Sequence, residues 1–193
     1  MIEVLRELRI PRPEHVVRQY PFQISGGMAQ RVMIGIATAL QPRLLIADEP
    51  TTALDVTVQA AILDELQQLK GRGTAILLIT HDMGVVARMA DDVAVMYGGR
   101  IVEYGPAQAL FDRPTHPYTY AMLATRPRPD EVRERLMVIP GTPPALLDQE
   151  DECPFLGRCP KALSVCRTDP MPLYEEVEPG HMVACYNQML NIA

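Results

Sequence analysis

Residues 24–55 read ISGGMAQRVMIGIATALQPRLLIADEPTTALD, and this stretch decides what kind of fold the chain forms. Ser25 suits the N-cap of a helix, and Gly26 and Gly27 let backbone N–H groups come close to a ligand. The first N–H groups of a helix favour an anion, most naturally a phosphate. The sequence therefore predicts a helix over residues 25–40 that begins at a phosphate-binding loop.

Two apolar runs predict neighbouring strands of a parallel sheet. Residues 44–47 read LLIA, as expected for a strand buried on both faces, and residues 75–79 read AILLI. Apolar residues at helical spacing between positions 58 and 69 predict the helix that connects the strands. Asp48 and Glu49 end the first strand and His81 follows the second, so all three are expected at the carboxyl edge, where such sheets bind ligands. The pattern predicts a doubly wound α/β fold.

Four segments, SGGMAQR, LLIADEP, ALD and THD, together resemble the signature loop, the Walker B strand, the D-loop and the switch histidine of ABC-type ATPases. The resemblance implies a partial P-loop NTPase fold with a parallel sheet and flanking helices. It implies that the protein uses ATP and Mg²⁺, with Asp48 holding Mg²⁺ through water and Glu49 acting as the catalytic base. It also implies that His81 hydrogen-bonds the γ-phosphate of ATP.

The same resemblance gives the signature loop a role across a dimer. It implies that Ser25, Gly26 and Gly27 of one domain close on the ATP held by another, and that Asp55 contacts this partner near its phosphate loop. Met28 stands where the family most commonly has glutamine, which leaves Ser25 and the backbone N–H groups to act there. Taken alone, the motifs have simpler interpretations as a helix cap, a solvated turn and a structural histidine.

The glycine-rich loop that ends in lysine and cradles the β- and γ-phosphates is missing from the 193 residues. The sequence contains only two lysines, Lys70 and Lys161, and neither follows a G-x-x-x-x-G pattern. The adenine-stacking segment and the glutamine loop of the family are missing as well. The resemblance therefore covers the C-terminal half of an ATP-binding subunit. We expect the isolated chain to be inactive as an ATPase and to associate through an open sheet edge.

Composition indicates a soluble protein that binds no nucleic acid. The formal net charge is −6, 48% of the residues are hydrophobic, and there is no basic block. No apolar run approaches the roughly 18 residues of a membrane-spanning helix. The first residues, MIEV, lack the core of a signal peptide. We therefore expect a cytoplasmic protein that reaches the membrane only by docking on other subunits.

The prolines divide the chain in two. Thirteen of the 18 prolines follow residue 105, which predicts a regular ATPase domain over residues 1–104 and a loop-rich extension over residues 105–193. Residues 113–119, RPTHPYT, together with Gly105 and Pro106, resemble the C-terminal extension of oligopeptide- and dipeptide-permease ATPase subunits. That resemblance implies uptake of peptides or nickel. His116 in this segment is expected to be structural.

Four cysteines follow in this extension, Cys153, Cys159, Cys166 and Cys185, with the spacing C-x5-C-x6-C-x18-C. A reducing cytoplasm disfavours disulfides, and the close cysteine pairs of structural zinc sites are missing. Four thiolates from loops can hold an iron–sulfur cluster. Related permease subunits have this pattern as a [4Fe–4S] site, so the resemblance implies the same cluster here. Zinc and four buried thiols remain open as alternatives.

These observations predict an ATP-hydrolysing subunit of an ABC importer for peptides, bound peripherally at the cytoplasmic face of the inner membrane. The implied partners are a second ATPase subunit, transmembrane permease subunits and, indirectly, an extracytoplasmic peptide-binding protein. Two alternatives from other classes remain. One is a truncated or split-gene remnant that at most binds a partner, and the other is an iron–sulfur sensor module that reuses the fold.

Overall fold

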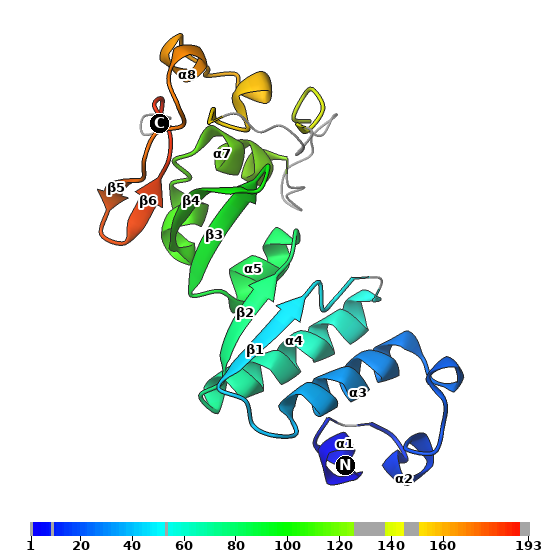
Figure 1. The fold of residues 1–193 in the computed structure, drawn as a ribbon. Helices are drawn as coiled ribbons and strands as arrows, with labels where there is room; N and C mark the ends of the chain where they lie inside the picture. Colours follow the sequence, from blue (N-terminus) through cyan, green and yellow to red (C-terminus); the bar gives the residue numbers. More distant parts are fainter. Residues whose placement is uncertain (1, 9, 53, 126–137, 145–150, 190–193) are drawn as a thin grey trace. The chain divides into compact units, whose positions relative to one another are not determined.

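The computed structural model describes residues 2–8, 10–52, 54–125, 138–144 and 151–189, and the chain divides into two compact units, Met1–Met89 and Ala90–Ala193 (Figure 1). The division precedes the hairpin of β3 (Asp92–Tyr97) and β4 (Arg100–Pro106). The boundary predicted after residue 104 instead falls inside β4. The hairpin belongs to the second unit because β4 pairs with β3 on one side and with β6 (His181–Val183), a strand of the extension, on the other.

The first unit is a βαβ motif with additional helices before it and one short helix after it. Strands β1 (Leu44–Asp48) and β2 (Ala75–Ile79) pair in parallel, and α4 (Val56–Gly71) connects them. The predicted strand ranges agree with the structure. The remaining elements are α1 (Ile2–Glu7), α2 (Pro13–Val16), the 3-10 helix η1 (Pro21–Gln23), α3 (Gly26–Thr38) and α5 (Met83–Met89).

The core of this unit lies between one face of the sheet and the helices. Leu45 of β1 packs in one apolar cluster with Ile62 and Leu66 of α4, and all three side chains are buried. Helix α1 approaches α3 closely because Gly35 has no side chain. A Cβ at this position would lie 3.2 Å from Cγ1 of Val4 in α1 and 2.8 Å from Cδ1 of Leu8, which directly follows α1. Burial of each large aliphatic side chain contributes about 1.5–3 kcal/mol to folding.

The opposite face of the sheet is open. Leu44, Ile46 and Leu77 lie on this face, and these residues are 55%, 61% and 51% exposed. The predicted α/β fold with a parallel sheet and flanking helices is confirmed, but burial of the first strand on both faces is wrong for the part of the chain that the structure describes. The apolar run was long enough for a fully buried strand, but in the described part of the chain helices cover only one of its faces.

We expect the isolated chain to self-associate through this open face and the adjoining strand edges. Replacing Ile46 and Leu77 with threonine keeps residues that favour strands but reduces the apolar surface. Light scattering after size-exclusion chromatography should then give a mass closer to the monomer value of 21.5 kDa. Leu40→Thr, at a 93% exposed side chain outside the sheet, is the matched control. A wild-type chain that stays monomeric at all concentrations would contradict this expectation.

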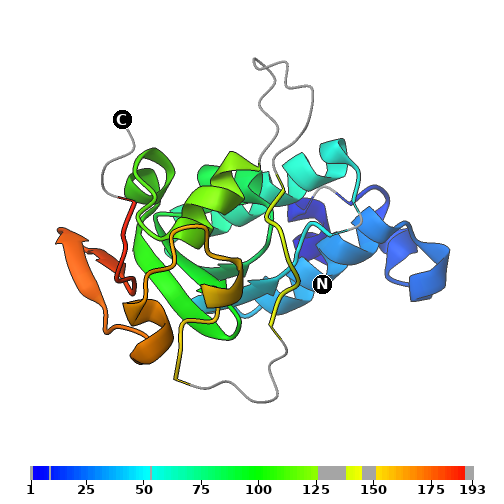
Figure 2. The ribbon, with the colours of Figure 1, turned by 90° about the horizontal axis from the view of Figure 1, so that it is seen from above.

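The second unit is built on an antiparallel sheet in the order β3-β4-β6-β5, where β5 spans Glu175–Glu178. The sequence Gly98-Gly99 between two strand-like runs is a strong hairpin signal, and these two glycines form the turn between β3 and β4 with φ of 54° and 76°, values that favour glycine. Figure 2 shows β5 and β6 at the edge of the hairpin sheet. The other elements are α6 (Ala107–Asp112), α7 (Pro117–Ala124), the 3-10 helix η3 (Leu156–Arg158) and α8 (Val165–Thr168).

A buried carboxylate ties three segments of the second unit together. Glu103 in β4 is 0% exposed. Its Oε1 accepts a hydrogen bond from the backbone N–H of Thr115 at 2.7 Å and lies 2.7 Å from Nε2 of His181. Its Oε2 accepts from the backbone N–H of His116 at 2.9 Å. Glu103 therefore fixes both β6 and the start of α7 against β4.

Candidate functional site

Glu49 and His81 meet at the carboxyl edge of the β1–β2 sheet. Glu49 follows β1, and its backbone N–H donates to the carbonyl oxygen of Ile79 at 2.9 Å. Its Oε1 lies 2.7 Å from Nδ1 of His81, and its Oε2 accepts a hydrogen bond from Oγ1 of Thr52 at 2.7 Å. Both carboxylate oxygens are thus held. Glu49 has a φ of 47°, a left-handed conformation that is uncommon for a residue other than glycine and frequent at functional sites.

The two side chains stabilise each other's charged forms. The hydrogen bond from Thr52, followed by that of His81, lowers the pKa of Glu49. The hydrogen bond to Glu49 and the negative charge of its carboxylate raise the pKa of His81. Both groups are accessible to solvent, so the pair lies where a ligand can reach it.

Replacing Glu49 with glutamine should lower the pKa of His81 toward its ordinary value of 6.5, because the substitution removes the carboxylate that raises it. In the wild type, the Glu49–His81 pair should make its whole contribution to stability between pH 4.5 and pH 6.5, the ordinary pKa values of a glutamate and a histidine. It is lost as pH rises through the raised pKa of His81 or falls through the lowered pKa of Glu49. NMR titration of the imidazole measures the shift. Glu3→Gln should leave the His81 midpoint in place, and the same midpoint after Glu49→Gln would show that the pair does not form in solution.

Asp48 ends β1 and is exposed on the open face of the sheet, opposite Ile79 of β2. Mg²⁺ prefers oxygen ligands and usually keeps several waters, so that one or two carboxylates are enough to hold it. An exposed aspartate at the end of a strand fits this requirement. Asp48 and Glu49 are adjacent in the chain, but only Glu49 is bonded to His81 in the structure.

The signature loop begins a helix whose start packs on α4. Ser25 is the N-cap of α3, and its Oγ accepts a hydrogen bond from the backbone N–H of Met28 at 3.3 Å. A Cβ on Gly27 would lie 2.6 Å from Cγ1 of Val58, so glycine permits this contact. A Cβ on Gly26 would meet nothing within 4 Å, which leaves its backbone open to a ligand. The predicted helix cap is therefore confirmed, and the open side of the loop remains accessible.

Asp55 caps α4 in the same way, with Oδ1 accepting from the backbone N–H of Val58 at 2.9 Å. Because Gly27 also contacts Val58, the first turns of α3 and α4 lie side by side. In addition, Nε2 of Gln30 in α3 donates to the carbonyl oxygen of Pro50, directly after Glu49, at 2.9 Å. The structure thus places Ser25–Gly27 and Asp55 close to the turn that carries Glu49.

Sequence reasoning did not single out three polar residues of this site. Thr52 holds Glu49, Gln30 ties α3 to the turn after β1, and Gln59 donates to Oδ2 of Asp82, next to His81, at 3.2 Å. Thr52 lies inside the TTALD segment, and its position three residues after an acidic residue was the available signal. The two glutamines lie on helix surfaces, where sequence alone does not separate them from solvated residues.

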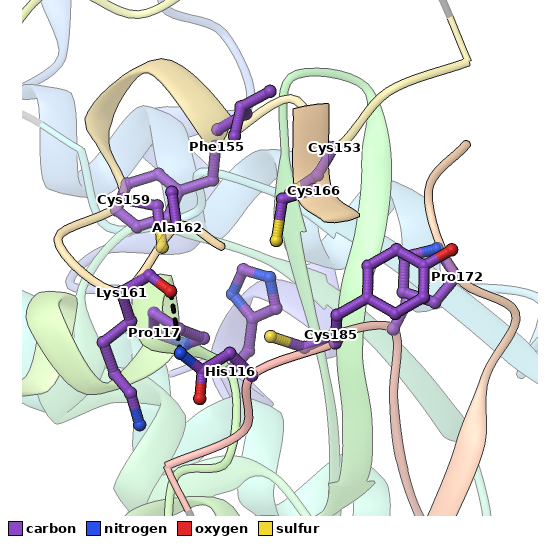
Figure 3. Close-up of a pocket in the computed structure, with 14 residues that line it drawn as sticks. His116, Pro117, Cys153, Phe155, Cys159, Lys161, Ala162, Cys166, Pro172 and Cys185 are labelled. Carbon is purple, nitrogen blue, oxygen red and sulfur yellow. Dashed lines mark hydrogen bonds between the residues drawn. The ribbon is translucent and has the colours of Figure 1, made fainter. Parts of the chain in front are cut away.

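The four cysteines line one cavity of the second unit. All four side chains are partly buried thiols, and Figure 3 shows the sulfur atoms of Cys159, Cys166 and Cys185 directed into a common space. Burial raises the pKa of Cys153 and Cys159, and raises that of Cys185 to about 12. Backbone N–H groups act in the opposite direction on these three thiols, since they hydrogen-bond to the sulfur and favour the thiolate. Such thiols ionise only when a cation compensates their burial.

Within the described ranges, no three His, Cys, Asp or Glu side chains are placed to hold a single metal ion. A tetrahedral zinc site with Zn–S bonds of about 2.3 Å brings its sulfurs to within about 3.8 Å of one another. A [4Fe–4S] cluster binds each thiolate to a different iron, so its ligand sulfurs stand further apart. The four thiols that line the cavity are of the residue type that either kind of site uses.

Two family models match the chain. The model described as ABC transporter matches residues 1–52, and the model described as oligopeptide/dipeptide transporter, C-terminal region, matches residues 102–166. Among solved structures, the ADP conformation of MJ1267, an ATP-binding cassette of an ABC transporter, is 25% identical with a TM-score of 0.51 over 58% of this chain and 45% of its own. An inward-facing putative metal-chelate type ABC transporter, 23% identical with a TM-score of 0.53 over 63% of this chain and 46% of its own, supports the fold. No helix in the described ranges has the length and apolarity to cross a membrane.

Curated relatives match nearly all of the chain. The probable peptide ABC transporter ATP-binding protein y4tR of Sinorhizobium fredii is 51% identical over 99% of this chain and 58% of its own length. The oligopeptide transport ATP-binding protein OppD of Salmonella typhimurium is 48% identical over 96% of this chain and 55% of its own length. The dipeptide transport ATP-binding protein DppD of Bacillus subtilis is 43% identical over 99% and 55%. The chain belongs to the ATP-binding proteins of ABC-type oligopeptide and dipeptide transporters, and it spans a little over half of the length of these relatives.

Proposed function

We propose that the chain forms part of the ATP-hydrolysing subunit of a peptide importer, and that polypeptide outside the 193 residues supplies the lysine loop for the phosphates. The observation that carries the proposal is the pairing of Glu49 with His81, 2.7 Å apart, at the carboxyl edge of a parallel sheet. Family membership supports it, because the relatives named above are ATP-binding proteins of peptide transporters.

In this proposal Glu49 is the general base. Its carboxylate takes a proton from a water molecule, whose oxygen attacks the γ-phosphorus of ATP as the bond to the bridging oxygen breaks, giving ADP and phosphate. The hydrogen bonds from Thr52 and His81 hold both carboxylate oxygens, so the base is oriented before the water arrives. Mg²⁺ held by Asp48 through water would neutralise charge that develops on the phosphates.

His81 has a second contact to make in the proposed site. Its Nδ1 is engaged by Glu49, which leaves Nε2 to reach the γ-phosphate. The side chain of His81 is 82% exposed, so nothing in the described residues blocks that approach. Protonation of His81, favoured by its raised pKa, would strengthen its hydrogen bond to a phosphate oxygen.

The signature loop would act on the nucleotide of a second ATPase domain. The backbone of Gly26 is open, and the N–H groups at the start of α3 suit a phosphate. Asp55, beside this loop, would contact the same partner. We propose that closure of the two domains moves transmembrane permease subunits, with this chain held at the cytoplasmic face of the membrane and a peptide-binding protein delivering substrate from outside.

Co-expression tests the ATPase proposal. The chain would be produced alone and together with the N-terminal portion of a peptide-transporter relative that carries the glycine-rich lysine loop. We expect no ATP hydrolysis from the chain alone and measurable hydrolysis from the purified pair. A stable pair without hydrolysis would favour a remnant that only binds a partner.

We also propose that Cys153, Cys159, Cys166 and Cys185 hold a [4Fe–4S] cluster. The four thiols line one cavity, and together they have the chemistry that iron–sulfur clusters require. Electron transfer to or from the cluster is the chemistry that it would supply when bound. The surrounding loops contain few strands, so a bound cluster would also stabilise the fold of this region.

Anaerobic purification tests the cluster. We expect a brown protein with about four iron atoms per chain. A colourless protein that carries zinc instead would eliminate the cluster. A redox titration of ATP hydrolysis by the co-expressed pair would then distinguish a stabilising cluster from a sensor, since only a sensor should change the rate with its oxidation state.

A further inference from the structure

His116 lies at the same cavity as the four cysteines, in a fixed orientation. Its side chain is 1% exposed and lines the cavity. Its backbone N–H donates to Oε2 of Glu103 at 2.9 Å, and its Nδ1 accepts a hydrogen bond from the backbone N–H of Tyr118 at 3.0 Å. The imidazole is thus the N-cap of α7, and these two bonds determine how the ring enters the cavity.

The bond from Tyr118 determines which ring nitrogen carries the proton. Because Nδ1 of His116 uses its lone pair as an acceptor, the neutral ring has its hydrogen on Nε2, which is then a donor. The hydrogen bonds that His116 makes with the described residues use its backbone groups and Nδ1, and none of them uses Nε2. In Figure 3 the ring lies among the sulfur atoms of Cys159, Cys166 and Cys185. The cavity that the ring lines is also lined by the four thiols.

We propose that Nε2–H of His116 donates a hydrogen bond to a sulfur atom of the metal group held by the four cysteines. The inference rests on the proposed cluster and adds a positioning residue that is not a ligand. Hydrogen bonds to sulfur stabilise the more negative, reduced state of an iron–sulfur cluster, so they raise its reduction potential. His116 therefore sets the redox potential of the site as well as capping α7.

Two substitutions separate the cap from the donor. In His116→Asn, the side-chain oxygen is at the distance of Nδ1 and keeps a cap acceptor for Tyr118, but nothing replaces the donor at Nε2. In His116→Gln, the amide nitrogen reaches the position of Nε2 and keeps the donor, while the cap is lost. We expect the anaerobically purified His116→Asn chain to retain its iron and to show a lower midpoint potential. A tenfold change in the equilibrium constant for reduction corresponds to about 59 mV for a one-electron couple. The His116→Gln chain should stay close to the wild type.

A measurement on the wild type tests the inference even if a variant fails to bind the cluster. With ¹⁵N-labelled histidine, electron–nuclear double resonance of the reduced cluster should show a weak nitrogen coupling, as expected across a hydrogen bond. Equal potentials in wild type and His116→Asn, a strong coupling that marks histidine as a ligand, or no coupling would each overturn the inference while leaving the cluster in place. A wild-type chain that binds no iron would overturn both proposals.

Discussion

Replacing Glu49 with glutamine is expected to slow ATP hydrolysis by the co-expressed pair at least about a hundredfold, the usual contribution of a general base. Glutamine has nearly the same shape and can still accept the hydrogen bond that Thr52 donates to Oε2. It cannot take a proton from the attacking water, and it loses the charge that attracts His81. The loss should therefore appear in kcat, with ATP binding retained. Steady-state phosphate release at saturating ATP and Mg²⁺ measures kcat, and nucleotide titration measures the affinity for ATP.

Glu3→Gln is the matched control, because Glu3 is an exposed carboxylate in α1. It should hydrolyse ATP at the wild-type rate. If Glu49→Gln keeps a rate within a few-fold of the control, Glu49 is not the base, although the fold and the family assignment stand. If both rate and ATP affinity fall, the substitution has disturbed the turn itself.

The parts of the fold that the sequence predicted are those set by neighbouring residues. Ser25 and Asp55 each bond to a backbone N–H three residues further along, so their capping roles depend on only a few positions. The strand predicted over residues 75–79 matches β2, because a short apolar run between a glycine turn and a polar segment can form few other secondary structures. The Gly98-Gly99 hairpin is local in the same sense.

The features that escaped prediction depend on residues far apart in the chain. Leu44 and Ile46 are as apolar as Leu45, so the run itself does not say that one face of β1 is open. Strand β5, with the sequence EEVE, resembles a solvated loop, and it becomes a strand because β6 pairs with it and with β4, near Glu103. Strand β5 pairs with the nearby β6, but β6 is held in the sheet by β4, about 80 residues away, and partners so far apart leave no local pattern.

The candidate site shows the same division. That Glu49 and His81 lie at one sheet edge followed from the order of strands and from the family resemblance. The hydrogen bond from Thr52 to Glu49 did not follow from them, because it depends on the left-handed backbone at Glu49, which turns the chain back toward Thr52. The cysteine spacing indicated a metal group, but it gave no sign that His116, 37 residues before Cys153, lines the same cavity.

Replacing Glu103 with alanine is expected to destabilise the second unit by about 3–5 kcal/mol, as for removal of one partner from a buried ion pair or hydrogen-bond network. The substitution leaves the backbone N–H groups of Thr115 and His116 and the ring of His181 buried without their acceptor. Desolvation of each such group costs about 1–3 kcal/mol. Amide hydrogen exchange in β4 and β6 measures the effect locally, which matters because the chain has two units.

Two further variants show whether the loss comes from the hydrogen bonds or from the missing volume. Glu103→Gln keeps one acceptor oxygen and nearly the same size, so it should lose less protection than Glu103→Ala. Glu152→Ala removes an exposed carboxylate of the same unit and should change exchange in β4 and β6 by less than about 0.5 kcal/mol. Because Glu103 also holds the backbone of His116, Glu103→Ala should loosen the start of α7. Exchange at α7 that stays at the wild-type level would show that the cap of His116 alone orders this segment, and that the buried carboxylate serves only β6.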